Sequence, residues 1–205
     1  MKSSAQRSVY IGYGFSQKTP PYMYGKDYRM NSSNLFTTDI LEAAFSHSIG
    51  KQWNLVHQAQ YFSRIYTGVA TKGGLGSGNT IQGQIKANYL YLGTGFEKYW
   101  GNKFQFYVAG GIQLGIRVHS GLNIFSYQYG PPSTYNDKPI ARDQLIHPVT
   151  LRAPVSFGLR YQLPYNVSIS ARYQIAPEFT HLGDYIGDIL PISQSIHFGL
   201  TYRLN

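Results

Sequence analysis

The sequence predicts an all-β fold: an eight-stranded antiparallel up-and-down transmembrane β-barrel, formed by residues 1–205 as a single domain. Three observations predict this fold. Apolar and polar residues alternate over unusually long stretches, short and long connections alternate along the chain, and charged residues make up only 13% of it. The chain holds 19 tyrosines and 22 glycines but no cysteine, which excludes disulfide scaffolds, thiolate metal sites and cysteine nucleophiles.

The alternation is clearest in the segment that starts at Lys103, KFQFYVAGGIQLGIRVH. Its even-numbered positions from Phe104 to Val118 hold apolar residues and one glycine, whereas the odd-numbered positions hold mainly polar or small residues. A period of two that lasts for about 16 residues indicates a strand, and one much longer than the ~5–6 residues of an average strand.

The same pattern repeats along the chain. It predicts strands at about 8–17, 38–49, 53–65, 80–97, 102–118, 148–163, 167–176 and 192–204. In the fourth of these, Tyr89 and Tyr91 fall on the apolar face, although a bulge near Leu90, Leu92 and Phe96 would change that register.

The connections predict how the strands are joined. Short turns are expected near residues 50–52, 98–101 and 164–166, and long loops rich in Gly, Pro and Ser near 18–38, 66–79, 120–147 and 177–191. In an up-and-down barrel the short turns then gather at one end together with both termini, and the long loops gather at the other.

The choice between a soluble and a membrane barrel depends on which face is outside. A soluble lipocalin-like barrel would turn its apolar face inward, whereas a membrane barrel turns it toward lipid. The apolar face is nearly uncharged, and the polar face carries Arg64, Lys86, Arg117, Arg152, Arg160, Arg172 and Arg203. Aromatic residues also gather at the short-turn end, namely Trp53, Tyr99, Trp100, Phe104 and Tyr165, as expected for an interfacial girdle. The membrane barrel is therefore favoured.

The C-terminal segment His197-Phe-Gly-Leu-Thr-Tyr-Arg-Leu204 resembles the β-signal of outer-membrane proteins, although Leu204 stands in place of the usual aromatic residue and Asn205 follows it. The whole chain resembles the small eight-stranded outer-membrane barrels, and its Tyr-rich strands are most similar to those of Bacteroidota, including the PorT-like group. This resemblance implies a location in the bacterial outer membrane, periplasmic termini and a signal peptide that has been removed. It also implies contact with outer-membrane lipid, including lipopolysaccharide.

The predicted lumen is strongly basic. Parity places Arg64, Lys86, Arg117 and Arg152 toward the long-loop mouth, and one strand carboxylate, Glu42, shares the lower lumen with Arg160, Arg172 and Arg203. One interpretation is a mouth site for an anion such as a lipopolysaccharide phosphate. The other is internal ion pairing, in which acids of the fourth long loop (Glu178, Asp184, Asp188) take part. The net charge of +9 does not predict nucleic-acid binding, because the basic residues follow a lumen rather than a groove.

His57 is unusual because parity places it on the lipid face, between Leu55 and Ala59 and near the middle of the bilayer. Three interpretations are open: a contact with another outer-membrane protein, a lipid-facing catalytic base, or a tolerated neutral histidine whose register a bulge could also change. No catalytic residue is predicted, because Ser46 and Ser48 point to the face opposite His47 and no carboxylate accompanies His57. The remaining histidines lack ligand spacing, so neither a metal site nor a cofactor is predicted.

Two long loops carry clustered tyrosines, namely Tyr22, Tyr24 and Tyr28 in the first and Tyr127, Tyr129 and Tyr135 in the third. They could anchor a partner or pack together as a lid. The sequence thus predicts a non-enzymatic interaction protein, an accessory subunit of a larger outer-membrane assembly. The alternatives are a narrow conduit or binder for small solutes and a lipid A-modifying enzyme.

Overall fold

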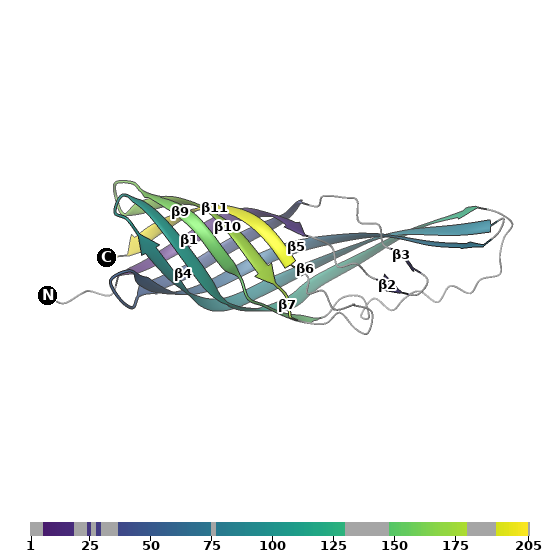
Figure 1. Ribbon diagram of the computed structural model, residues 1–205, viewed down its shortest axis with the longest axis horizontal. Helices are drawn as coiled ribbons and strands as arrows, with labels where there is room; N and C mark the ends of the chain where they lie inside the picture. Colours follow the sequence, from purple (N-terminus) through teal and green to yellow (C-terminus); the bar gives the residue numbers. More distant parts are fainter. Residues whose placement is uncertain are drawn as a thin grey trace.

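A computed structural model describes residues 6–18, 24–25, 28–29, 37–74, 77–129, 148–179 and 192–204. They form a closed antiparallel barrel of eight staves, where a stave is one strand of the wall or two short consecutive strands that together occupy one position in it (Figure 1). The staves are β1 (Arg7–Lys18), β4 (Thr37–Ser48), β5 (Trp53–Gly74), β6 (Ser77–Trp100), β7 (Phe104–Tyr129), the stave shared by β8 (Val149–Arg152) and β9 (Val155–Gln162), β10 (Val167–Pro177) and β11 (Ile192–Leu204). The short strands β2 (Tyr24–Gly25) and β3 (Tyr28–Arg29) pair with each other. No helix in the described ranges is long and apolar enough to cross a membrane.

The barrel closes where the first and last strands meet. β1 and β11 pair continuously from Arg7↔Leu204 to Lys18↔Ser193. β1 also pairs with β4 on its other side, so neither edge of this strand is free. Closure of this kind satisfies the backbone hydrogen bonds of every stave without water, which a lipid environment requires.

The short turns lie at the end of the barrel where β1 begins and β11 ends, as predicted (Figure 1). Two of these turns contain residues with a positive φ: Gly101 (97°), and Tyr165 and Asn166 (62° each). A Cβ atom on Gly101 would lie 2.2 Å from the carbonyl oxygen of Phe104, so this turn requires glycine.

Three strands extend beyond the lengths that the sequence predicts. β5 runs to Gly74, β6 starts at Ser77 and β7 runs to Tyr129, so most of the loop predicted at 66–79 and the first part of the loop predicted at 120–147 are strand. The prediction was wrong there because the alternation of apolar residues marks only where a strand faces lipid. The backbone hydrogen bonds between neighbouring strands continue past that point, through segments made of small polar residues and glycines.

The structure reverses the predicted orientation of two tyrosines in β6. Tyr89 and Tyr91 are buried in the lumen (1% and 0% exposed), whereas Leu92 and Phe96 face outward. These odd-numbered residues face inward because β6 pairs with β5 without a register shift, and Tyr89 lies opposite the buried Phe62. The extra residue of the bulge is Val118 of β7, which lies between the partners of Asn88 and Tyr89.

The stave predicted at 148–163 is interrupted at Ala153 and Pro154, between β8 and β9. Pro154 has no N–H group to donate to a ladder. Its carbonyl oxygen accepts a hydrogen bond from Gly111 N (3.1 Å), and Ala153 N donates to Pro177 O (3.1 Å). The break therefore leaves these neighbouring backbone groups paired.

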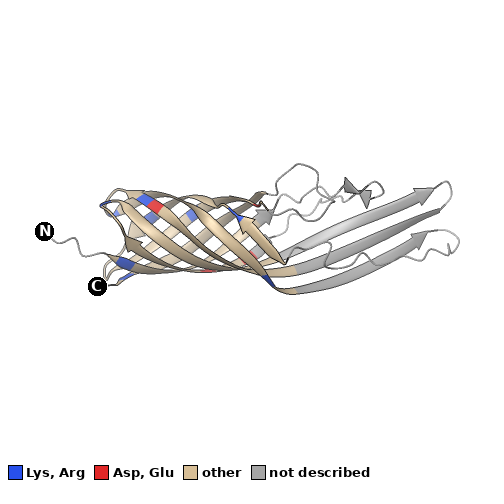
Figure 2. Ribbon diagram, turned by 90° about the horizontal axis from the view of Figure 1, so that it is seen from below, with Lys and Arg blue, Asp and Glu red and all other residues tan. Residues whose placement is uncertain are grey.

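The outside of the barrel is an apolar belt. β11 alternates between exposed and buried side chains along almost its whole length, and residues such as Ile11 (67%) and Ile112 (62%) are exposed. Figure 2 shows that few charged residues interrupt the described wall. At the short-turn end Lys98 Nζ lies 5.2 Å from the ring centres of both Trp53 and Trp100. Apolar side chains outside and polar ones inside are the arrangement of a transmembrane barrel.

Candidate functional site: the polar lumen and the outer wall

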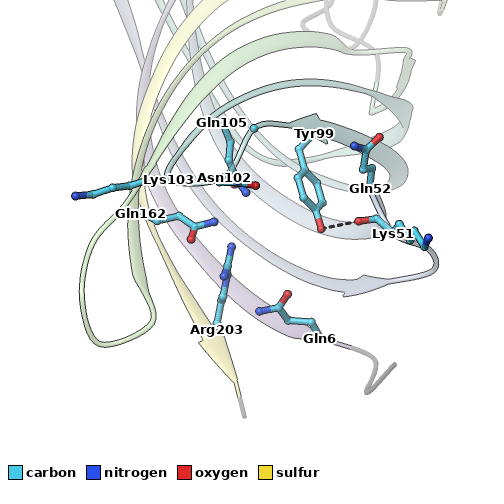
Figure 3. A pocket seen from close by; sticks show the side chains of 10 residues that line it. Gln6, Lys51, Gln52, Tyr99, Asn102, Lys103, Gln105, Gln162 and Arg203 are labelled. Carbon is cyan, nitrogen blue, oxygen red and sulfur yellow. Dashed lines mark hydrogen bonds between the residues drawn. The ribbon is translucent and has the colours of Figure 1, made fainter. Parts of the chain in front are cut away.

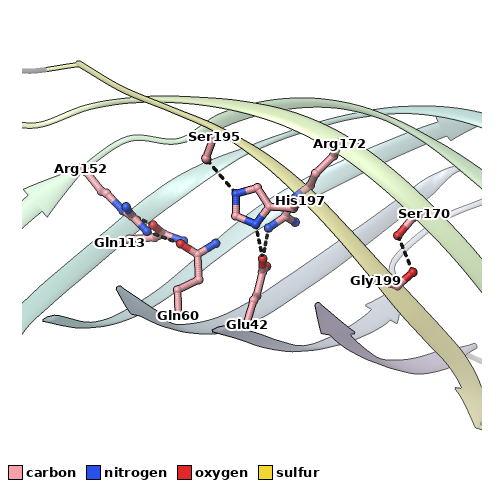
Figure 4. Close-up of polar contacts among 9 residues, drawn as sticks. All are labelled: Glu42, Gln60, Gln113, Arg152, Ser170, Arg172, Ser195, His197 and Gly199. Carbon is pink, nitrogen blue, oxygen red and sulfur yellow. Dashed lines mark hydrogen bonds and ion pairs between the residues drawn. The ribbon is translucent and has the colours of Figure 1, made fainter. Parts of the chain in front are cut away.

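The upper part of the described lumen is filled by Arg152, which is 1% exposed. Its Nε donates a hydrogen bond to Gln113 Oε1, and its Nη2 donates to Gln60 Oε1 (Figure 4). Its guanidinium carbon lies 3.6 Å from the ring centre of Tyr91, whose hydroxyl oxygen accepts a hydrogen bond from Thr150 Oγ1 (3.1 Å). We call these residues the Arg152 layer.

The middle of the lumen is centred on Glu42, which is 3% exposed. Its Oε2 forms an ion pair with Arg172 Nη2, and His197 Nδ1 lies 3.1 Å from the same oxygen. The other ring nitrogen of His197 is 2.8 Å from Ser195 Oγ (Figure 4). These four residues form the Glu42 layer. They come from β4, β10 and β11, so only closure of the barrel brings them together.

The lower lumen holds a second ion pair. Arg160 Nη2 lies 3.0 and 3.1 Å from the two carboxylate oxygens of Glu97, and Asn54 Nδ2 donates to Glu97 Oε1 (3.3 Å). The Arg160 guanidinium also lies 5.0 Å from the ring centre of Tyr107. We call this set the Glu97 layer. An eight-stranded barrel is just narrow enough for such side chains to fill it.

The structure places the predicted lumen residues in different layers of the lumen. Glu42 pairs with Arg172, in line with internal ion pairing, but Arg160 pairs with Glu97, which was not among the predicted lumen residues. The statement that Glu42 is the only strand carboxylate was therefore wrong. Glu97 was hidden because β6 was assigned the wrong parity, although the even-numbered apolar residues Leu90, Leu92 and Phe96 indicated the other one. Arg203 has no carboxylate partner among the described residues.

The predicted mouth cluster of Arg64, Lys86, Arg117 and Arg152 is described only in part. Arg117 points inward and is partly exposed, and Arg152 belongs to a buried layer. Arg64 and Lys86 lie in β5 and β6, but their side chains are outside the described part, so an anion site formed by all four stays a prediction. Of the loop acids, Glu178 forms a β-bridge with Arg152 and is buried, while Asp184 and Asp188 lie outside the described residues.

On the outer wall the predicted orientation of His57 is confirmed. β4 and β5 pair without a register shift, Phe45 lies opposite His57, and His57 is exposed. The His57 ring stacks on His47, with centroids 5.9 Å apart and planes 25° apart. In the neighbouring registers Arg7 pairs with His47 and Thr94 pairs with His57. We call Arg7, His47, His57 and Thr94 the histidine patch.

The order of contacts in the Glu42 layer is that of a nucleophile, a base and an acid: Ser195, His197 and Glu42. This arrangement is not visible in the sequence, because Glu42 lies far from Ser195 and His197 along the chain. The same Glu42 oxygen, however, is bound by Arg172, and Ser195 is only 5% exposed. Ser46 faces the lumen, where its Oγ is 2.6 Å from Ser8 Oγ, so it cannot act with the outward His47.

Few other side chains on the described outer wall could act together with His57 in catalysis or bind a metal ion. Asp39 faces outward and accepts a hydrogen bond from Tyr13 OH (2.5 Å), but it is six residues from Phe45, the partner of His57. At ~3.3 Å per residue that is about 20 Å, too far to orient the imidazole. Among the described residues no group of three or more His, Asp or Glu could hold a metal ion.

The loop tyrosines are largely outside the described part of the chain. Tyr24 and Tyr28 lie in the β2–β3 hairpin, and Tyr127 and Tyr129 lie near the end of β7, but their side chains are not described. Tyr22 and Tyr135 fall outside the described ranges altogether. Their role as anchors or as a lid stays a prediction.

Comparison with known proteins identifies the fold. No family model and no curated protein matches the chain. Among solved structures it is similar to Ail, the attachment invasion locus protein of Yersinia pestis, with a TM-score of 0.52 and 13% identity over 98% of this chain and 99% of that one. It is also similar to Neisserial surface protein A, with a TM-score of 0.52 and 8% identity over 97% of each chain. The finer resemblance to the PorT-like group is not confirmed. The chain therefore has the fold of the small eight-stranded outer-membrane β-barrels.

Proposed function

We propose that the protein is an integral outer-membrane β-barrel without enzymatic activity, which binds another outer-membrane protein through the histidine patch as an accessory subunit of a larger assembly. The observation that carries this proposal is the stacked pair of His47 and His57 on the lipid-facing wall. Imidazole nitrogens need hydrogen-bond partners, which lipid tails do not offer, so polar side chains at this depth commonly serve a function.

The depth of His57 supports this proposal. Trp53 belongs to the aromatic girdle, and His57 follows it by four residues on β5. At ~3.3 Å per residue and ~40° of tilt, His57 is about 10 Å inside the girdle. The patch crosses β1, β4, β5 and β6 in adjacent registers and includes the guanidinium of Arg7, so a partner that offers acceptors would find a continuous polar surface.

The filled lumen argues against the alternative of a conduit. The Arg152, Glu42 and Glu97 layers each place buried, hydrogen-bonded side chains across the interior. The exposed apolar belt implies contact with lipid all around the wall, and lipopolysaccharide is the proposed lipid partner at the long-loop end.

The test is purification from native outer membranes in mild detergent, with mass spectrometry of whatever accompanies the barrel. A stoichiometric protein partner is expected with the wild type and is expected to be lost with His57→Leu. The matched control is Gln194→Leu, which removes an outward polar side chain elsewhere on the wall. A barrel that carries only lipid, or a partner that survives His57→Leu unchanged, would refute the proposal.

A second candidate, hydrolysis within the lumen, is favoured only by the contact order of Ser195, His197 and Glu42. A fluorophosphonate probe tests it directly. Labelling of Ser195 that is lost in Ser195→Ala would support a hydrolase, and an unlabelled Ser195 in folded protein would show that these contacts are structural.

A further inference from the structure

The short-turn end of the lumen contains a polar cavity of about 420 Å³, which we call the vestibule (Figure 3). Its polar lining is dominated by Gln6, Gln52, Asn102, Gln105, Gln162 and Arg203. A volume of this size falls within the range of small-molecule sites. None of the vestibule residues belongs to the histidine patch or to the layers that fill the lumen.

Arg203 provides a charge that the described residues do not neutralise. Its guanidinium points into the vestibule between Gln162 and Gln6 (Figure 3). Glu42 is engaged with Arg172 and Glu97 with Arg160, and the third buried carboxylate, Glu178, forms a β-bridge with Arg152 in the upper part of the lumen. A partly buried guanidinium without a counter-ion attracts an oxyanion, and its planar donors fit a carboxylate or a phosphate.

Arg203 is better placed for this role than its basic neighbour Lys103. Lys103 Nζ lies 5.4 Å from the ring centre of Tyr161, and Figure 3 shows its side chain directed away from the vestibule. Both residues add positive charge to the same end of the barrel, but only Arg203 directs hydrogen-bond donors into the cavity. The two residues therefore form a natural pair for distinguishing a specific contact from general attraction.

The carboxamides of the lining provide the second half of the site. Gln105 is 3% exposed, and its Oε1 has no hydrogen-bond partner among the described residues. A buried polar atom without a partner is costly, and a ligand that supplies the missing hydrogen bond recovers that cost. Because carboxamides both donate and accept, the lining suits a ligand that carries N–H or O–H groups besides its anionic group.

We propose that the vestibule binds a small ligand that combines an oxyanion with amide or hydroxyl groups. The oxyanion pairs with the Arg203 guanidinium, and the N–H or O–H groups of the ligand bond to the carboxamides around it, including Gln105. The bound group is a carboxylate, as at the end of a short peptide, or a phosphate. Both share the chemistry that Arg203 recognises.

The experiment uses the full chain refolded in detergent micelles, with folding verified by the gel-mobility shift on heating. Backbone amide NMR shifts are followed during titration with trialanine, trialanine amide and inorganic phosphate. Trialanine is expected to shift resonances at the short-turn end, whereas trialanine amide, which lacks the carboxylate, is expected to bind at least about tenfold more weakly. Saturable shifts with phosphate as well would identify a general oxyanion site, and shifts with trialanine alone would identify a carboxylate site.

Two variants give the decisive comparison. Arg203→Gln is expected to weaken binding at least about tenfold, whereas Lys103→Gln, which removes the same charge outside the cavity, is expected to change it less than about threefold. If Arg203→Gln does not refold, Gln162→Leu provides the test, because it removes a lining carboxamide and leaves the charge. Absence of saturable shifts with all three probes, or equal weakening in the two charge variants, would overturn the proposal.

Discussion

The guanidinium carbon of Arg152 lies 3.6 Å from the ring centre of Tyr91, in the interior of the barrel. The ring therefore supports one face of a cation whose edge is held by the carbonyl oxygens of Gln60 and Gln113. These contacts replace part of the water shell of a charge that is only 1% exposed.

We expect Arg152→Ala to destabilise the barrel by about 2–4 kcal/mol, because it leaves two buried carboxamides without their donor and opens a cavity. Equilibrium urea unfolding of the refolded protein, followed by tryptophan fluorescence, measures this. Arg203→Ala is the control, since that arginine has no ion-pair partner among the described residues, and its effect should stay below about 1 kcal/mol. Equal losses in the two variants would contradict the role given to the Arg152 layer.

For the Glu42 layer, we expect Glu42→Gln to cost about 3 kcal/mol, because Arg172 is left as a buried charge without its carboxylate. The double variant Glu42→Gln/Arg172→Met should recover a large part of that loss, since it removes the uncompensated charge as well. The same unfolding assay supplies the double-mutant cycle. Strictly additive effects would show that the pair is not coupled.

Gly14 gives a test of packing. A Cβ atom at this position would lie 2.8 Å from His197 Nδ1 and 3.0 Å from the carbonyl oxygen of Ile196. We therefore expect Gly14→Ala to destabilise the barrel by about 1–3 kcal/mol. Gly50, in the turn after β4, has no atom near its Cβ position, so Gly50→Ala should change stability by less than about 0.5 kcal/mol. A Gly14→Ala variant as stable as Gly50→Ala would show that the Glu42 layer is loosely packed.

The filled lumen predicts the electrical behaviour of the barrel. In planar lipid bilayers the wild-type protein should give no steady single-channel conductance, since three layers of hydrogen-bonded side chains block the interior. Replacing Arg152, Arg172 and Arg160 together with serine should introduce a small conductance if the barrel still folds. Steady channels from the wild type would revive the conduit function.

The sequence predicted the barrel because lipid outside and a polar lumen inside impose a period of two, which strands such as β11 keep along almost their whole length. It predicted the outward position of His57 for the same reason. It did not predict the orientation of Tyr89 and Tyr91, because tyrosine occurs both in the lumen, as at Tyr107, and on the outer wall, as at Tyr61. The extension of β5 to Gly74 was also hidden, since a ladder of glycine and threonine looks like a loop in sequence.

The candidate sites were predicted less well than the fold. The contacts of Glu42 with Arg172 and His197 depend on which staves face each other across the lumen, and alternation within single strands does not contain that information. Parity placed Arg203 in the lumen correctly. It could not show that the carboxylate of Glu97, the type of group that would pair with Arg203, is already engaged by Arg160. The vestibule depends on turn geometry at several places along the chain, so it emerges only from the three-dimensional structure.

The seam between β1 and β11 has a consequence for how the protein is made. Its two halves come from opposite ends of the chain, so no partial product can form it. Contacts between such distant segments carry the largest loop-closure entropy and form late. An intermediate that lacks β11 must keep two unpaired edges away from both lipid and other chains. Biogenesis therefore depends on whatever shields these edges until the last strand arrives, and a truncation at the C-terminus should act as an assembly defect rather than as a local loss of stability.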